Sequence, residues 1–177
     1  MIQNSVKKKF GVVWWSFLSS FLGIAILALL QFQMSYYLPT GSKLTTLVAS
    51  FGAVSILVFG AIEAPLAQPR NAILGNTLSA FVGVVVHYIF KSSPELEWLA
   101  AAFSVSFALV AMQITDTVHP PGGATALIAI IAGDEIHDLG FLYVIIPVFV
   151  GTCILVCVSV VVNNIQRQYP RYWLTKN

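Results

Sequence analysis

Two short proline-containing segments hold most of the polar side chains that could do chemistry in this chain. The second segment reads His119, Pro120, Pro121, Gly122, Gly123. Proline is tolerated in the first turn of a helix, so these prolines predict that a helix begins there. The first amide N–H groups of a helix have no partner within it, the glycines leave them uncovered, and the helix dipole makes this end positive. The segment therefore predicts a binding site for a small anion.

The first segment supplies a permanent positive charge. It reads Gln68, Pro69, Arg70, Asn71 within otherwise apolar surroundings. Arginine keeps its proton at physiological pH and carries five N–H donors, and asparagine is a natural cap for the helix that we expect to follow. We expect Arg70 and the glycine amides of the second segment to share one anion. Asn71 and Thr125 would add hydrogen bonds to it.

Each of these features also has a plainer explanation. Glycine and proline occur in most loops, and His119 would then only bond a neighbouring carbonyl. Arg70 would contact lipid phosphate as part of the usual bias of basic residues toward the cytoplasm. If His119 is functional, its unperturbed pKa near 6.5 would let it sense or carry a proton. Glu63 and Asp116 could each pair with Arg70 or His119, and the residues alone do not decide between these interpretations.

The composition places both segments in a membrane protein. Of 177 residues, 58% are hydrophobic and 9% are charged, and the mean hydropathy is +0.85. A soluble domain is about a quarter charged, so this chain has too few charges to cover a water-exposed surface. A cytosolic enzyme and a nucleic-acid-binding protein are therefore excluded. We expect one transmembrane domain over residues 1–177, surrounded by the lipid bilayer.

The apolar runs predict the number of membrane crossings. Backbone groups have no water to bond to in lipid, so helices are expected, each with about 20 apolar residues. Five runs are long enough to span: 11–32, 44–62, 72–90, 96–114 and 141–162. A sixth run, 122–132, is shorter and reaches only about 16 Å as a helix. The predicted fold is an all-α polytopic transmembrane helical bundle of five to six spans, including one short or broken helix.

Basic residues at the two ends of the chain predict its orientation. They precede the first run or follow the last: Lys7, Lys8, Lys9, Arg167, Arg171 and Lys176. Lysine and arginine are enriched in cytoplasmic loops, so both termini of this multi-pass protein are expected on the cytoplasmic side of the plasma (inner) membrane. Six crossings then place Arg70 and His119 on that side. The acidic loop 133–140 falls on the other side with His137, so we expect no metal site.

The two segments together resemble a known family. Residues 119–127 read HPPGGATAL and residues 65–71 read PLAQPRN. This pattern resembles the HPP family of small integral membrane proteins, named for its His-Pro-Pro motif, and the likeness covers about residues 10–165. Some cyanobacterial and plastid relatives are associated with nitrite transport, so the resemblance implies a transporter or channel for a small inorganic anion, nitrite first. Members often have histidine where this chain has Asn76.

The resemblance also implies which residues matter. In this sequence they are Gln68, Pro69, Arg70, Asn71, His119, Pro120, Pro121, Gly122, Gly123 and Thr125. The three prolines shape the motif, and the other residues would bind the substrate.

Two other functions stay open. His119 and Asp116 could form a base and its orienting group, but no Ser or Cys nucleophile stands in a recognisable setting, so we expect no enzyme, no catalytic residue and no cofactor. A structural or regulatory membrane subunit is the other alternative. A bundle this small rarely encloses a pathway alone, so we expect a homo-oligomer. Stripes of small residues or the aromatic first span would form its contacts: Gly75, Ser79, Gly83 and Ala100, Ser104, Ala108.

Overall fold

The computed structural model describes residues 2–37 and 47–174, and their side chains over 10–33 and 49–174. Every regular element in this part of the chain is a helix. The longer helices are α1 (Ile2–Tyr37), α2 (Leu47–Ser55), α3 (Asn76–Phe90), α4 (Glu97–Ile114), α5 (Pro121–Ile131) and α7 (Val150–Asn163). Shorter ones are α6 (Asp134–His137), the 3-10 turns Pro65–Ala67 and Pro94–Leu96, and the π-helical turns Ile56–Gly60, Asn71–Gly75 and Val144–Phe149.

The apolar helices have the lengths expected of a transmembrane bundle. Four are long enough to cross a membrane: Phe10–Gln33, Asn71–Phe90, Pro94–Ile114 and Val144–Asn163. Two are shorter, Ala49–Gly60 and Pro121–Ile131. The predicted helical bundle with a short helix is therefore confirmed. Within the run 44–62 the described helix ends at Gly60, because the backbone leaves the helical conformation at Ala61 (φ −111°, ψ 46°). Residues 44–46 lie outside the described residues.

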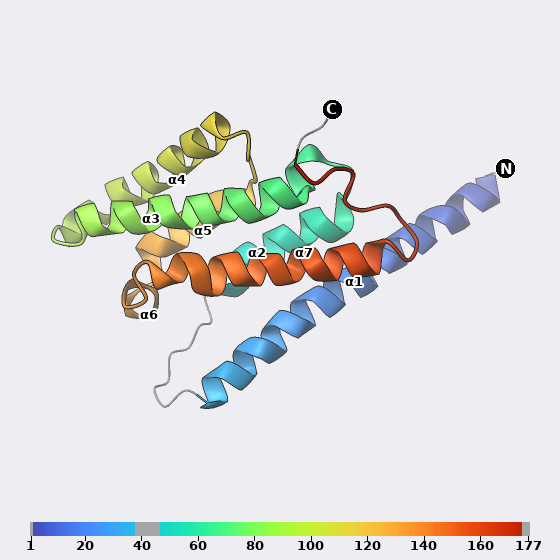
Figure 1. Ribbon diagram of the computed structural model, residues 1–177, viewed down its shortest axis with the longest axis horizontal. Coiled ribbons are helices and arrows are strands. Elements are labelled where there is room, and N and C mark those ends of the chain that lie inside the picture. The colour runs from blue at the N-terminus through green and yellow to red at the C-terminus, as the bar shows by residue number, and fades with distance from the viewer. Residues whose placement is uncertain (1, 38–46, 175–177) are drawn as a thin grey trace.

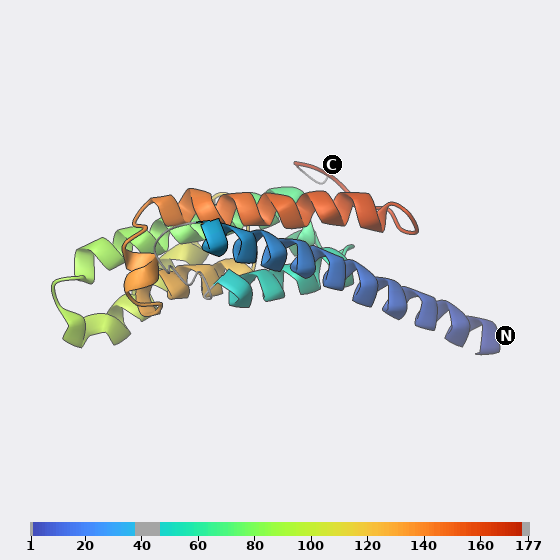
Figure 2. The same cartoon turned by 90° about the horizontal axis from the view of Figure 1, so that it is seen from below.

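The helices lie side by side along the long axis of the molecule (Figure 1). Helix α1 packs against α7, and its N-terminal end projects beyond the other helices (Figure 2). The start of α1 and the segment after α7 lie toward the same end, and α6 lies at the opposite end (Figure 1). This arrangement agrees with an even number of crossings. The side chains of Lys7, Lys8 and Lys9, and the whole of Lys176, lie outside the described residues.

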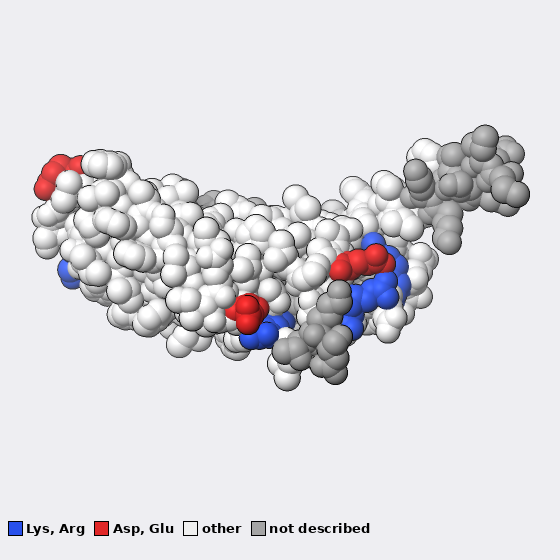
Figure 3. All heavy atoms as spheres, turned by 90° about the horizontal axis from the view of Figure 1, so that it is seen from above, with Lys and Arg blue, Asp and Glu red and all other residues white. Residues whose placement is uncertain are grey.

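Charged side chains are few and clustered, and most of the face in Figure 3 is uncharged. Around the two proline segments and the C-terminal segment the charged residues are Glu63, Arg70, Asp116, Arg167 and Arg171. Near the α3–α4 loop and α6 they are Lys91, Glu95, Glu97, Asp134, Glu135 and Asp138. The helices between these two regions present an apolar surface, as a bilayer requires.

Small residues let α3 and α5 approach closely. A Cβ added at Gly83 would lie 2.7 Å from the carbonyl oxygen of Ala126, and one at Gly122 would lie 2.5 Å from Ser79 Oγ. The stripe on α4, Ala100, Ser104 and Ala108, is also buried. Both stripes therefore serve packing within the chain, and they are not free for the contacts between copies that the sequence suggested.

A buried polar group joins three helices at Asn76. Its Nδ2 donates to Thr152 Oγ1 on α7 at 3.1 Å, and its Oδ1 accepts from Thr125 Oγ1 on α5 at 3.0 Å. Tyr143 Oη donates to the Thr125 carbonyl at 3.0 Å. Such bonds between helices fix α5 against its neighbours inside an apolar environment.

Candidate functional site

The two proline segments touch each other directly. Asn71 Nδ2 donates to the Val118 carbonyl at 2.9 Å, and His119 Nδ1 lies 2.8 Å from the Leu66 carbonyl oxygen. Arg70 Nη2 donates to the Thr115 carbonyl at 2.8 Å. We call this contact between residues 61–71 and 115–122 the loop junction. The structure thus brings together the two segments that the sequence predicted to share one side.

Arg70 lies at the surface of the loop junction and is half-buried. It stands just before the helix that begins at Asn71, and its Nη1 also donates to the Leu174 carbonyl at 3.3 Å. Its two bonds to described residues leave three of its five N–H groups for a ligand. The hollow beside it measures about 550 Å³ and is lined by Arg70, Leu74, Thr77, Leu78, Phe81, Thr115, Thr117 and Val144. The guanidinium and three threonines thus supply the polar part of a mostly apolar hollow.

The glycine amides do not have the freedom that the sequence suggested. Gly122 N–H donates to the His119 carbonyl at 2.9 Å, and Gly123 N–H donates to the Pro120 carbonyl at 3.0 Å. Ser79 and Met112 fill the space over Gly122, where an added Cβ would lie 3.1 Å from Met112 Sδ. The expectation of open amides that hold an anion with Arg70 is therefore wrong. The turn closes on itself and α3 packs over it.

Thr125 and Gln68 are structural in this arrangement. Thr125 is fully buried and bonds Asn76, so it joins α5 to α3. Gln68 is also fully buried. Its Nε2 donates to the carbonyls of Ile62 and Ala64, and its Oε1 accepts from the Arg171 amide. Gln68 therefore ties the C-terminal segment to the first proline segment.

The prolines act as predicted for the second segment, since α5 begins at Pro121 with Pro120 at its cap. Pro69 is buried within the loop junction. The sequence suggested that Glu63 and Asp116 could each pair with Arg70 or His119, and the structure shows a different arrangement. Glu63 forms an ion pair with Arg171, and the Asp116 side chain is exposed.

His119 is the one fully buried histidine among the described residues. A carbonyl oxygen only accepts hydrogen bonds, so the contact with Leu66 places the ring proton on Nδ1. Nε2 is buried and has no hydrogen-bond partner among the described residues. His119 lies in the loop between α4 and α5, and burial lowers its pKa to about 4. The ring is therefore neutral at physiological pH.

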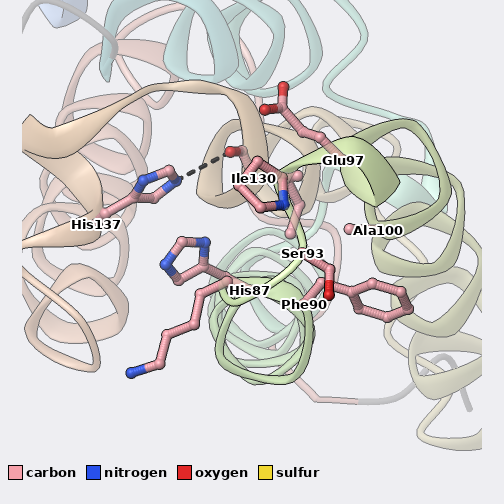
Figure 4. Close-up of a pocket in the computed structure, with 9 residues that line it drawn as sticks. His87, Phe90, Ser93, Glu97, Ala100, Ile130 and His137 are labelled. Carbon is pink, nitrogen blue, oxygen red and sulfur yellow. Dashed lines mark hydrogen bonds between the residues drawn. The ribbon is translucent and has the colours of Figure 1, made fainter.

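A second hollow, which the sequence did not indicate, lies between the α3–α4 loop and α6. The rings of His87 and His137 stack there with centroids 3.8 Å apart and an interplanar angle of 22°, and His137 Nε2 lies 2.9 Å from the Ile130 carbonyl oxygen. Figure 4 shows the pair beside Ser93 and Glu97. The hollow measures about 200 Å³. Because lone pairs of imidazole lie in the ring plane, two stacked rings are poorly placed to share one metal ion.

Comparison with known proteins settles the family. The model of the HPP transmembrane region matches residues 5–170, nearly the whole chain. The chain belongs to the HPP transmembrane family. Two transmembrane proteins of Dictyostelium discoideum are 38% and 39% identical to this HPP chain over 97% and 90% of its length. The chain covers 54% and 55% of these relatives, so it spans about half their length. No solved structure matches this HPP protein.

The family and the apolar helices together establish a multi-pass membrane protein. Several motif residues of this HPP protein, Arg70, Asn71 and His119, make the bonds of the loop junction. Counting crossings predicted that the two segments share one side, whereas the pairing of His87 with His137 depends on how α6 folds back onto α3. One signal for that pair was available, because six crossings put both residues at the same end of the bundle.

Proposed function

We propose that this protein moves a small inorganic anion across the membrane and that Arg70 receives the anion at the loop junction. Nitrite is the substrate that the family resemblance suggests. The observation that carries the proposal is the placement of Arg70, whose permanent charge faces a hollow of about 550 Å³ with three N–H groups unbonded to described residues. The proposed anion contact is the Arg70 guanidinium, in place of the glycine amides, because the Thr115 hydroxyl already donates to the Ala111 carbonyl at 2.8 Å.

The role of Arg70 in receiving the anion is tested by replacing it with glutamine. Arg70→Gln is expected to lower nitrite uptake into proteoliposomes about tenfold or more, because a hydrogen bond to a charged group contributes roughly 1.5–3 kcal/mol. Arg171→Gln is the matched control. It removes the same charge at the same end of the bundle, but its side chain pairs with Glu63 rather than facing the hollow, so uptake is expected to stay at the wild-type rate.

The same assay distinguishes the competing functions. Undiminished flux in Arg70→Gln would remove Arg70 from the site. A wild-type protein that moves none of nitrite, nitrate, bicarbonate, formate or chloride, at either of two pH values, would reject transport and favour a structural or regulatory subunit.

We also place the loop junction and both termini on the cytoplasmic side of the plasma membrane. Arg70, Arg167 and Arg171 lie at the loop-junction end, whereas Lys91 is the only lysine or arginine among the described residues at the other end. Basic residues favour the cytoplasmic side.

We further propose that copies associate through α1. Its outward aromatic residues, Phe10, Trp14, Phe17 and Phe21, are 58–71% exposed, and three of their rings stack in a row. Purified protein is expected to have a detergent-corrected mass of at least two chains, and Trp14→Ala with Phe17→Ala is expected to shift it toward one. A wild-type mass of one chain would contradict this assembly.

A further inference from the structure

One nitrogen inside the loop junction is a hydrogen-bond acceptor without a donor. The Nδ1–H of His119 is committed to the Leu66 carbonyl at 2.8 Å. In a neutral imidazole the other nitrogen then carries a lone pair and no hydrogen. That nitrogen, Nε2, is fully enclosed and unpartnered among the described residues.

Among the described residues, no charged neighbour turns this nitrogen into a donor. Arg70 bonds the carbonyls of Thr115 and Leu174, and the carboxylate of Asp116 is exposed. On the C-terminal segment, the Tyr169 hydroxyl donates to the Ala67 carbonyl at 2.7 Å, and Arg171 pairs with Glu63. Gly75, the last residue of the π-helical turn Asn71–Gly75, lies against His119. An enclosed imidazolium would thus have no carboxylate among the described residues to stabilise it.

An acceptor of this kind discriminates between two forms of the substrate. The oxygens and nitrogen of nitrite present only lone pairs, so the bare anion would repel Nε2. The conjugate acid presents an O–H group, which satisfies Nε2 and removes the cost of an unpaired buried acceptor. His119 is a neighbour of the hollow, because Thr117, which lines the hollow, and His119 both lie against Gly75.

We propose that His119 Nε2 accepts the acidic proton of the transported species, so that the anion crosses together with one proton. This inference rests on the proposed function and adds the protonation state of the substrate. The anion first meets Arg70 in the hollow. It then takes a proton from the water on that side, and the O–H bond donates to Nε2. On the far side the acid releases the proton to water, so His119 ends unchanged and no net charge crosses the membrane.

The test uses proteoliposomes of the full chain, with nitrite as the probe and a pH-sensitive dye inside. Uptake is measured under a pH gradient without membrane potential, and under a valinomycin potential without a pH gradient. Protein-free vesicles give the background of nitrous acid that diffuses through lipid, which is subtracted. Protein-dependent uptake is expected to rise about tenfold for each pH unit of external acidification, as the fraction of nitrous acid does. Uptake is expected not to depend on the membrane potential, and each nitrite taken up is expected to release one proton into the lumen.

Two variants locate the proton acceptor. In His119→Asn the amide can still donate to the Leu66 carbonyl but offers nothing at the position of Nε2, so uptake driven by the pH gradient is expected to fall about tenfold. Asp116→Asn is the control for the nearest carboxyl group in sequence. Asp116 has φ 53°, a conformation that asparagine tolerates, and this variant is expected to keep both its rate and its dependence on the pH gradient. An unchanged elution volume in size-exclusion chromatography and an unchanged melting temperature at pH 7.5 would show that both variants fold.

The outcomes separate this inference from the proposed function. Wild-type uptake that follows the membrane potential without acidifying the lumen would mean that the bare anion moves, which overturns the inference and leaves anion transport standing. A His119→Asn protein with wild-type coupling would also overturn it. Absence of any protein-dependent flux would reject both.

Discussion

Gly75→Ala is expected to destabilise the protein by about 2–3 kcal/mol and to lower its melting temperature by roughly 5–10 °C. An added Cβ would lie 2.4 Å from the Thr117 carbonyl oxygen and 2.8 Å from His119 Cβ. The first of these atoms belongs to the backbone, so the second proline segment would have to move as a whole away from the turn Asn71–Gly75. Alanine is otherwise the better residue in a helix. A loss of stability would therefore report the clash, measured by thermal unfolding of purified protein in detergent.

Gly123→Ala is the matched control for this prediction. Gly123 lies two residues into α5, and an added Cβ would meet only Val105 Cγ1 at 3.8 Å, an ordinary contact. We expect its melting temperature to stay unchanged or to rise slightly. Equal melting temperatures for the two variants would contradict the close contact of Gly75 with the second proline segment. Nitrite uptake by Gly75→Ala is also expected to fall, since both Thr117 and His119 would be displaced.

The protein is expected to lose stability as the pH falls from about 6.5 toward 4, and His119 is expected to account for about 3 kcal/mol of that loss. Burial lowers the pKa of His119 to about 4 in the folded protein, whereas the unfolded chain has the ordinary value near 6.5. Between these values the unfolded chain binds a proton that the folded protein does not. Acidification therefore favours unfolding, and the contribution of His119 is fully present only above about pH 6.5.

Thermal unfolding of wild type and His119→Asn between pH 7.5 and 4.5 checks this expectation. Other groups, such as the exposed carboxylates, titrate alike in both proteins, so the difference between the two curves isolates His119. The melting temperature of wild type is expected to fall more steeply with decreasing pH, and the variant to be the flatter of the two. Parallel curves would contradict a buried, neutral ring.

Part of the loop junction could be foreseen from residue types. His119 and Arg70 were assigned to the same side of the membrane by counting crossings, and the prolines placed the start of α5 at Pro121. Neither step required a partner residue. The surroundings of Gly122 did require one, because its open face is filled by Ser79 and Met112 on other helices. A glycine that leaves space for a ligand and a glycine that leaves space for a helix look the same in a sequence.

The chain by itself determined that it is a helical membrane protein, because so few charges cannot cover a soluble surface and lipid leaves the backbone no partner outside a helix. Tertiary structure alone decided which small residues meet, how Asn76 joins α3, α5 and α7, and that the second ring nitrogen of His119 is enclosed without a donor. The physical reason is that apolar side chains contribute little free energy to the association of helices in lipid, because lipid is equally apolar. Their partners are chosen by close fit and by polar bonds between particular side chains, and both depend on the register of one helix against another.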